Sequence, residues 1–398
     1  MKNQLNHPTI SIDDIIRPTH VEVDLKTLAE NFKKIKKYIG HIKIMPILKA
    51  NAYGHGIIEI ARQSLENGTE VLGVANIEEG TQIRKAGINA PVLILSYAPP
   101  EQSKELIEFD LTQTVYSYET AKSLSEAASA YGKKIKVHIK VDTGMGRLGL
   151  LPNQLRLSKY DKEITDSSAS EVESIFRLPM LEIEGIFTHF ATADKLDRSY
   201  ANNQFEIFMD FLNQLRINGM ETPVTHAANS AAIINMPETH LDMVRAGISI
   251  YGLYTSEEVD RSIIKLKPAM ELKTKIIHLK KVPAGFKVSY GITYETERPT
   301  TIATVRIGYA DGLNRLLSSN GRMLVCGQSA PIVGRVCMDF TMLDVGEIPE
   351  VVMEEEVVVF GKQGNSSITV DEIASTINTI NYEVVSTIME RVPRIYLR

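Results

Sequence analysis

The residue with the clearest chemical potential is Lys49, near the end of the apolar run IKIMPILKA at residues 42–50. A lysine at the end of a buried strand is partly desolvated, which disfavours its charged form and lowers its pKa. Such an amine can attack a carbonyl carbon and form a Schiff base. From position alone an alternative stays open, in which the aliphatic stem is buried and the ammonium group reaches water.

Further residues follow this apolar run and later ones in the same manner. They are Asn51, Tyr53, His55, Lys140, Asp142, Arg147, His189, His226, Asn229, Ser230, Arg245, Gly247 and Ile248. If the runs are parallel strands of one barrel, their carboxyl ends meet at one face and these residues converge. Ser230 with Gly247 and Ile248 would suit a phosphate, because loops at that face often bind it through backbone N–H groups. An ordinary tight turn is the alternative there.

Two other kinds of site are weighed against this one. Residues 144–149, GMGRLG, fit the G-x-G-x-x-G pattern of dinucleotide-binding turns, but they follow the fifth apolar run rather than the first. NAD binding is therefore placed last among the alternatives. The nine histidines show no H-E-x-x-H or paired Cys/His spacing, so no metal site is predicted. Cys326 and Cys337 stand in strand-like contexts and are expected to be small core residues.

The composition excludes several classes of protein. The 398 residues include 44 Lys and Arg against 49 Asp and Glu, and a net charge of −5 argues against a nucleic-acid-binding surface. No apolar run approaches the roughly 18 residues that span a bilayer, so no membrane segment is expected. The first twenty residues lack the apolar stretch of a secretory signal. With only two cysteines, the sequence predicts a cytoplasmic protein.

The elements that must position these residues form an alternating pattern over the first two thirds of the chain. Eight strand candidates are separated by spacers of helical length: residues 42–50, 71–75, 91–96, 112–117, 134–142, 181–189, 223–229 and 240–247. The periodicity of Leu25, Leu28, Phe32, Ile35 and Ile39 predicts one such helix, with Asp24 as its N-cap and Gly40 at its end. Eight βα units predict an α/β fold of the (β/α)8 TIM-barrel type.

The last third of the chain has a different pattern of apolar and polar residues. From about residue 265 apolar and polar residues alternate with period two, which predicts a mainly antiparallel β domain. We expect a barrel at 21–264, a β domain at 265–398, and an extended segment at 1–20 that joins the β domain. Residues 151–180 are rich in Ser, Asp, Glu and Lys, and are read as a polar insertion in the barrel.

Several segments of this chain resemble the motifs of alanine racemases. They are PILKANAYGHG (46–56), KVDTGMGRLG (140–149), THFATAD (188–194), HAANSAA (226–232), VRAGISIYG (244–252), VSYGITY (288–294), IGYADG (307–312), GRVCMD (334–339), NYE (381–383) and RVPRIY (391–396). They occur in order from residue 46 to the C-terminus. The resemblance implies an enzyme that uses pyridoxal 5′-phosphate (PLP), with a barrel followed by a β domain, as the residue pattern also predicts.

The resemblance also implies roles for individual residues. Lys49 would carry PLP as a Schiff base and act as one acid/base, and Tyr290 would act as the second on the opposite face. Arg245 would donate to the pyridine nitrogen, and His189 would support the ring. The other implied cofactor contacts are Tyr53, Asn229, Ser230, Gly247, Ile248 and Tyr382.

The substrate side of the implied site involves three residues. Arg147 would contact the substrate carboxylate and Met338 would contact the substrate through its backbone. Lys140 is implied to be carbamylated and to position Arg147, and a plain salt bridge between Lys140 and an aspartate is the alternative. In the family the β domain of one subunit covers the barrel mouth of the other. The resemblance therefore implies a homodimer with sites shared between subunits, in which Tyr290 acts in trans.

The first interpretation is an alanine racemase, and four alternatives remain beside it. A slightly wider pocket would make the enzyme a racemase of serine or other small amino acids. A PLP-dependent decarboxylase usually pairs a carboxylate with the pyridine nitrogen, so Arg245 argues against it. A non-catalytic PLP carrier would lack the β domain that holds Tyr290. The NAD oxidoreductase rests on residues 144–149 alone. The sequence leaves open whether D-alanine is made for peptidoglycan or broken down.

Overall fold

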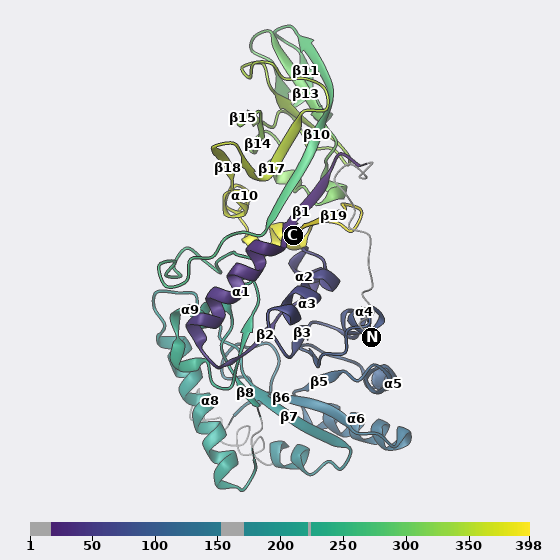
Figure 1. Cartoon of the computed structure of the whole chain (residues 1–398), viewed down its shortest axis with the longest axis vertical. Helices are drawn as coiled ribbons and strands as arrows, with labels where there is room; N and C mark the ends of the chain where they lie inside the picture. The colour runs from purple at the N-terminus through teal and green to yellow at the C-terminus, as the bar shows by residue number, and fades with distance from the viewer. Residues whose placement is uncertain (1–16, 153–170, 222–223) are drawn as a thin grey trace. The chain divides into compact units, whose positions relative to one another are not determined.

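The computed structural model describes residues 17–152, 171–221 and 224–398, which fall into two compact units (Figure 1). One unit consists of residues 28–52 and 57–268. The other consists of the residues before Leu28, the short segment 53–56, and residues 269–398. The predicted segment 1–20 lies mostly outside the described residues, and so do residues 153–170 of the predicted insertion 151–180.

The first unit is built on eight parallel strands, as the sequence predicts. They are β2 (Lys43–Pro46), β3 (Leu72–Val74), β4 (Val92–Ile94), β5 (Thr112–Val115), β6 (Ile135–Lys140), β7 (Leu181–Phe187), β8 (Val224–His226) and β9 (Met243–Ala246). Strands β3 to β8 pair in chain order, and β2 pairs with β9. A parallel bridge between Ile47 and Gly73 joins β2 to β3, and the Arg245 N–H donates to the Ala228 carbonyl at 2.9 Å. These links close the sheet into a (β/α)8 barrel.

Helices precede and connect these strands. They are α1 (Leu25–Ile39), α2 (Lys49–Tyr53), α3 (Ile57–Glu66), α4 (Ile77–Lys85), α5 (Ser103–Glu108), α6 (Tyr118–Tyr131), α8 (Ser199–Ile217) and α9 (Ser230–Asn235), with short 3₁₀ turns at Pro100–Gln102 and Pro237–Thr239. The α1 prediction is confirmed, since its apolar face is buried and Asp24 Oδ1 accepts the Thr27 N–H at 2.9 Å. Among the described helices, none has both the length and the apolar composition needed to cross a bilayer.

The second unit is mainly antiparallel. Its nine-stranded sheet has the order β15-β14-β17-β10-β1-β19, with β13 paired to β10 and β16, and β18 paired to β17. The strands are β1 (His20–Asp24), β10 (Met270–Val282), β13 (Thr300–Val305), β14 (Arg322–Val325), β15 (Gln328–Pro331), β16 (Thr341–Asp344), β17 (Glu356–Gln363), β18 (Ser366–Ile368) and β19 (Arg394–Leu397). A small pair, β11 (Lys287–Val288) and β12 (Tyr294–Glu295), flanks a 3₁₀ turn at Tyr290–Ile292. Helices α10 (Val370–Thr376) and α11 (Asn381–Ser386) complete the unit.

The period-two pattern at the start of β10 places alternate side chains in the core, because successive side chains of a strand point to opposite faces. Met270, Leu272 and Ile276 are buried, as the sequence predicts. Residues 20–24 form strand β1, which lies between β10 and β19, whereas the sequence placed residues 21–24 with the barrel. Val21 and Val23 are fully buried there, but five residues are too few to show which sheet they join. The domain boundaries 1–20, 21–264 and 265–398 stay predictions.

The two cysteines do not lie in the core, so that expectation is wrong. Cys326 is exposed and Cys337 is half-buried. Each follows a short apolar run, but Cys326 has a φ of +48°, at the turn between β14 and β15, and Cys337 precedes the exposed Met338. Turn positions leave the strand pattern, and this is why the sequence misplaced these residues.

Candidate active site

Lys49 stands where β2 gives way to α2, at the carboxyl end of a barrel strand. The three residues after it turn in the left-handed sense, with φ values of 53°, 53° and 54°. Such a conformation costs roughly 1–2 kcal/mol for each residue with a Cβ, so neighbouring groups must hold it. Glu79 Oε1 accepts the Ala50 N–H at 2.7 Å, and Asn51 Oδ1 accepts the Ile57 N–H at 2.8 Å.

The environment of Lys49 favours its neutral form. Burial lowers the pKa of the amine, and the positive charge of Arg147 lowers it further. The carboxylate of Glu79 acts in the opposite direction, but its effect is smaller. Because an amine attacks a carbonyl only when it is unprotonated, the site is suited to the Schiff-base chemistry predicted for Lys49.

Asp142 explains the glycine-rich turn at residues 144–149. Its Oδ1 accepts the backbone N–H groups of residues 144–146 at 2.9, 2.8 and 3.1 Å, and its Oδ2 accepts that of Arg147 at 3.0 Å. At Gly149 φ is +142°, and a Cβ would lie 2.3 Å from the Asp142 nitrogen, so only glycine fits. The N–H groups that a dinucleotide would need are used by this carboxylate. The turn therefore serves to place Arg147, which argues against NAD binding.

Lys140 ends β6 and is buried beside the same turn. Burial, followed by the charges of Arg147 and Arg245, lowers the pKa of Lys140 to about 8. Asp142 opposes this shift only in part. Among the described ion pairs, none joins Lys140 to Asp142, whose oxygens accept backbone N–H groups instead.

Four basic side chains thus act on one another at this end of the barrel: Lys49, Lys140, Arg147 and Arg245. Their mutual repulsion lowers pKa values, and it would be relieved by a bound anion. The nearest carboxylates, Asp142 and Glu79, each accept hydrogen bonds from backbone N–H groups. The electrostatics of the barrel mouth therefore fit a ligand that carries phosphate or carboxylate groups.

Arg245 is buried and held by backbone carbonyls. Its Nη2 donates to the carbonyls of Thr188 and Ala227, each at 2.7 Å, and its Nη1 donates to the carbonyl of His226 at 3.1 Å. Burial and the charge of Arg147 lower the pKa of Arg245 to about 9, so it stays protonated at neutral pH. The guanidinium plane is thereby fixed. Because its Nη hydrogens point to these carbonyls and to His226 Nδ1, the Nε–H is the donor that it can offer to a bound ring.

Three histidines line this guanidinium group, and the tautomer of His226 follows from the hydrogen bonds. Arg245 Nη1 lies 2.8 Å from His226 Nδ1, and its Nη2 lies 3.2 Å from His189 Nδ1. Guanidinium can only donate, so His226 Nδ1 must accept. The two hydrogens of Nη2 point to the Thr188 and Ala227 carbonyls at 2.7 Å, so the longer contact to His189 does not fix the tautomer of that ring. The proton of neutral His226 then sits on Nε2, which donates to His138 Nδ1 at 2.9 Å. Burial and the charge of Arg245 lower the pKa of all three histidines, in the case of His138 to about 3.

Gly185 makes room for this histidine chain. A Cβ at Gly185 would lie 2.4 Å from Cε1 of His138, so a larger residue would displace that ring. The ring of Phe187 stacks on His226 with a centroid separation of 4.7 Å and an angle of 6°. Neither His138 nor Gly185 stood among the predicted site residues. The sequence contains part of this information. His138 lies within an apolar run, and a buried histidine needs a hydrogen-bond partner.

Replacing His138 with leucine is expected to destabilise the fold by about 1–3 kcal/mol, because the buried Nε2–H of His226 would lose its acceptor. Urea unfolding of His138→Leu measures this free energy. His138→Asn is the matched control, because its side-chain oxygen can accept the same hydrogen bond and should restore most of the loss. A leucine variant as stable as the unmodified protein would contradict this assignment of the tautomers.

Ser230 lies at the start of α9, beside the loop after β9. Its Oγ accepts the N–H groups of Gly247 at 2.9 Å and Ser249 at 3.3 Å, and it lies 3.0 Å from the Ser249 hydroxyl. Among the described residues, the backbone N–H of Ile248 has no hydrogen-bond partner. Asn229 Oδ1 accepts the Ala232 N–H at 3.0 Å and caps the helix. This cluster of hydroxyl and N–H groups is the arrangement expected at a phosphate.

The remaining predicted residues lie in the β domain. Tyr53 packs against Tyr382, with ring centroids 5.8 Å apart. The side chain of Tyr290 is 70% exposed in its 3₁₀ turn, and that of Met338 is 54% exposed. Ser289 Oγ donates to the Arg335 carbonyl at 2.7 Å, which ties the turn of Tyr290 to the segment before Met338.

Comparisons with known proteins decide the family. Residues 23–255 match the family profile described as alanine racemase, N-terminal domain, and residues 269–396 match that of the alanine racemase C-terminal domain. The chain belongs to the alanine racemase family. An alanine racemase of Desulfosudis oleivorans is 50% identical over 376 residues, which cover 94% of this chain and 95% of that protein. Membership of the family makes this chain an amino-acid racemase, which is an isomerase.

Solved structures agree with the family assignment. The alanine racemase of Clostridium difficile 630 superposes with a TM-score of 0.89 at 40% identity, covering 96% of both chains. A histidine racemase of Leuconostoc mesenteroides has a TM-score of 0.87 at 28% identity, covering 96% of this chain and 99% of that one. The alanine racemase fold therefore occurs in proteins named for different amino acids, and substrate choice must be argued from the site.

Proposed function

We propose that this protein interconverts L-alanine and D-alanine with PLP as its cofactor. The observation that carries the proposal is the cluster of four basic groups around Lys49, two of which, Lys140 and Arg245, are buried. In this cluster the pKa of Lys49 is lowered, and Arg245 can donate hydrogen bonds but cannot accept them. Relatives named alanine racemase that match nearly the whole chain support alanine as the substrate.

The residues at the barrel mouth fit each part of PLP. Lys49 would hold the aldehyde carbon through its amine, and Arg245 would donate to the pyridine nitrogen. Ser230, Gly247 and Ile248 would bind the phosphate, to which Ile248 brings an N–H with no partner among the described residues. Tyr53 and Tyr382 are proposed as further contacts of the phosphate. When bound, the cofactor would delocalise the electron pair left on the substrate carbon by loss of its proton.

The chain itself moves the proton. Inversion at a carbon centre requires one group that removes the proton from one face and another that returns a proton to the opposite face. We assign these roles to the Lys49 amine and the Tyr290 hydroxyl, which exchange roles when the reaction runs in reverse. Arg147 would hold the substrate carboxylate, and the backbone N–H of Met338 would add a hydrogen bond to it. His189 would support the cofactor ring beside Arg245.

Lys140 is proposed to be carbamylated, and its lowered pKa supports this. At pH 8 about half of an amine with a pKa of about 8 is neutral, against roughly 0.3% for an ordinary lysine. The ammonium group first loses a proton to solvent. The neutral amine then attacks CO2, an N–C bond forms as one C=O π bond of CO2 breaks, and a second proton is released to solvent. The lysine changes from a cation to an anion, which gives Arg147 a negatively charged partner and relieves the repulsion among the basic groups.

Carbamylation is expected to increase from pH 7 to pH 9 as the Lys140 amine loses its proton. A carbon-13 NMR spectrum recorded with labelled bicarbonate should show one carbamate signal, which disappears in acid and in Lys140→Ala. Lys136→Ala is the matched control, because Lys136 lies on the same strand beside Asp110 and should leave the signal unchanged. No signal at pH 8.5 in bicarbonate would rule the modification out.

A homodimer with shared sites is proposed from the exposed side chains of the β domain. The turn that carries Met338 lies beside residues 308–311, because the Ala310 N–H donates to the Met338 carbonyl at 3.0 Å. Ser289 Oγ joins the turn of Tyr290 to the segment that leads to Met338. These turns expose large apolar side chains: Tyr290, Ile292, Tyr309, Met338 and Phe340. Contiguous exposed apolar residues of this kind mark interaction surfaces. In the proposed dimer, Tyr290 of one subunit serves Lys49 of the other.

Mixing two inactive variants is expected to restore activity. If Lys49→Ala and Tyr290→Phe chains are dissociated together and reassembled, half of the dimers would be mixed, and each mixed dimer would contain one intact site. About one quarter of normal activity should return, measured by chiral analysis of alanine. Each variant reassembled alone is the control. Absence of recovery from a mixture that forms mixed dimers would place both groups within one chain.

The substrate range follows from the same site and is tested separately. The histidine racemase relative supports an alternative in which serine or another amino acid is turned over. Purified enzyme, a panel of single-enantiomer amino acids and chiral detection of the products test this directly. Alanine should give the highest kcat/KM, and a different preferred amino acid would overturn the proposal. The cytoplasmic location stays a prediction from the sequence.

A further inference from the structure

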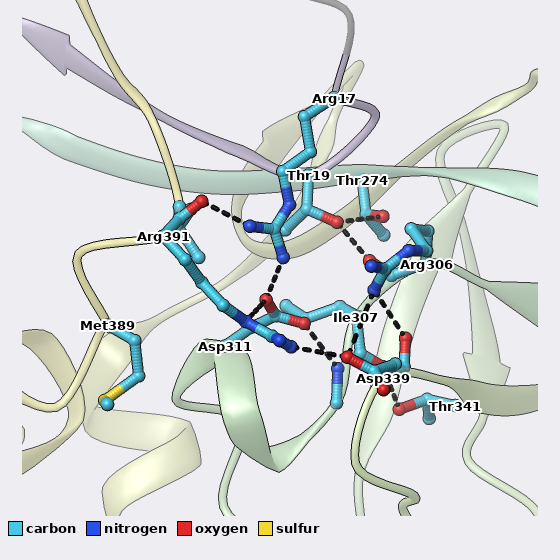
Figure 2. Close-up of polar contacts among 12 residues, drawn as sticks. Arg17, Thr19, Thr274, Arg306, Ile307, Asp311, Asp339, Thr341, Met389 and Arg391 are labelled. Carbon is cyan, nitrogen blue, oxygen red and sulfur yellow. Dashed lines mark hydrogen bonds and ion pairs between the residues drawn. The ribbon is translucent and has the colours of Figure 1, made fainter.

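The β domain contains a cluster of charged side chains to which the proposed reaction assigns no role. This arginine–aspartate cluster consists of Arg17, Arg306, Asp311, Asp339 and Arg391 (Figure 2). Asp311 and Asp339 belong to the segments IGYADG and GRVCMD, and Arg391 opens RVPRIY. Three of the segments that resemble the family therefore meet at one place, although they are distant in sequence.

The centre of the cluster is the fully buried carboxylate of Asp311. Its Oδ1 accepts hydrogen bonds from Arg17 Nη2 and from Arg391 Nε, the latter at 2.8 Å. Its Oδ2 accepts the Gly308 N–H at 3.0 Å, and its backbone carbonyl accepts the Met389 N–H at 3.2 Å. Asp311 thus fixes the turn at residues 308–311 and the direction of the Arg391 side chain.

Arg391 connects this buried carboxylate to the turn that contains Met338. Its Nη2 donates to Asp339 Oδ1 at 2.7 Å (Figure 2). Arg306 Nη1 donates to the Asp339 carbonyl at 3.2 Å and lies 3.6 Å from Oδ1. Asp339 is therefore held by both its side chain and its main chain. An exposed ion pair contributes little by itself, but Arg391 is already fixed by Asp311 and need not be ordered again.

The residue beside Asp339 is Met338. Its backbone carbonyl and its backbone N–H differ in their hydrogen bonding. Its carbonyl accepts the Ala310 N–H at 3.0 Å. Among the described residues, its own N–H has no acceptor. The direction of that N–H is set by the peptide plane between residues 337 and 338. The Cys337 carbonyl belongs to this plane and accepts the Tyr309 N–H at 3.0 Å. The cluster holds the next peptide plane through Asp339 and so limits rotation about the Met338 Cα between the two planes.

We propose that Asp339, held by Arg391 and Arg306, is a positioning residue that aims the Met338 N–H at the substrate carboxylate. This inference rests on the proposed function, because it assigns the carboxylate of the amino-acid substrate to that N–H. The contact is present before and after the proton moves, so it binds substrate and transition state about equally. Its loss therefore raises KM and leaves kcat nearly unchanged.

Asp339→Ala and Asp339→Asn in the holoenzyme test the proposal. The side chain of Asp339 is 34% exposed, so its removal leaves the fold intact, whereas a change at buried Asp311 would not. Asp339→Ala should raise the KM for alanine about tenfold with kcat within twofold, the size expected for loss of a hydrogen bond to a charged group. Asp339→Asn should bring KM back to within about threefold, because its amide oxygen still accepts from Arg391. Glu347→Ala, which breaks the exposed Arg298–Glu347 pair in the same domain, should change neither constant.

A second readout does not depend on activity. Cys337 lies in the affected turn, and the exposed Cys326 lies in another turn of the same domain. Alkylation followed by peptide mass spectrometry should show Cys337 reacting at least about five times faster in Asp339→Ala, with Cys326 unchanged as the internal reference. The alkylation rate does not depend on which substrate the enzyme uses. A failure of the proposed function can therefore be distinguished from a failure of this inference.

Three results would overturn the inference. If Cys337 reacts at the same rate in Asp339→Ala as in the unmodified protein, the cluster does not hold the turn. If Cys337 reacts faster but the KM for alanine is unchanged, the turn is held by Asp339 but does not aim a substrate contact. A KM increase that Asp339→Asn fails to reverse would also contradict it, because the amide keeps the hydrogen bond from Arg391.

Discussion

Lys49→Ala is expected to lower the rate of racemisation at least about 10⁴-fold in both directions, because the variant would lose the proposed covalent anchor of the cofactor and one of the two proposed proton-transfer groups. No other described lysine combines the position of Lys49 at the end of β2 with its neighbours Arg147 and Glu79. Initial rates from each enantiomer, followed by chiral chromatography, give the measurement.

The same variant has a matched control on the same strand. Lys43 begins β2, is largely exposed, and lies 3.4 Å from Glu70. Lys43→Ala should keep its activity within twofold. Borohydride reduction of the unmodified holoenzyme should attach the cofactor to the peptide with Lys49 and not to that with Lys43. Activity of Lys49→Ala above one tenth of normal, or a label on another lysine, would contradict the assignment.

Tyr290→Phe is expected to lower racemisation about 10²–10⁴-fold in both directions, the range for loss of one general acid/base group. The change removes only the hydroxyl, and the 70% exposure of the ring in this chain makes a loss of stability small. Denaturant unfolding should confirm that the variant folds normally.

Tyr309→Phe is the control for Tyr290→Phe, because it removes a hydroxyl from another exposed tyrosine of the same domain. It should reduce kcat far less. A Tyr290→Phe enzyme with kcat within tenfold of normal would exclude the tyrosine as a proton-transfer group and leave Lys49 to act with a partner not yet identified.

The barrel could be predicted from sequence because each strand is short, apolar and followed by a helix of suitable length. The run at 42–50 illustrates this, since a strand buried on both faces appears as an almost continuous apolar stretch. The same reasoning selected Lys49, Lys140 and Arg245 as candidates, because the chemistry of a barrel lies where the strands end. Local patterns were therefore sufficient for the fold and for the residues that follow strands.

Features that depend on distant residues could not be predicted in this way. His138 and His226 are 88 residues apart and bond only after the barrel closes. The sequence of residues 144–149 fits a nucleotide-binding loop. In the structure, however, the Asp142 carboxylate accepts the backbone N–H groups of this turn. The left-handed turn after Lys49 lacks the glycines that usually signal positive φ, because hydrogen bonds from other segments stabilise it.

The pairing of Lys49 with Tyr290 on opposite faces of the substrate is tested most directly by α-hydrogen exchange. Tyr290→Phe holoenzyme is incubated in deuterium oxide with L-alanine or D-alanine separately, and the deuterium at the α-carbon is measured by mass spectrometry. The account predicts that one enantiomer gains deuterium without inversion, through Lys49, while the other gains almost none. Equal deuterium incorporation into both enantiomers would show that one group serves both faces, and the two-base account would be wrong.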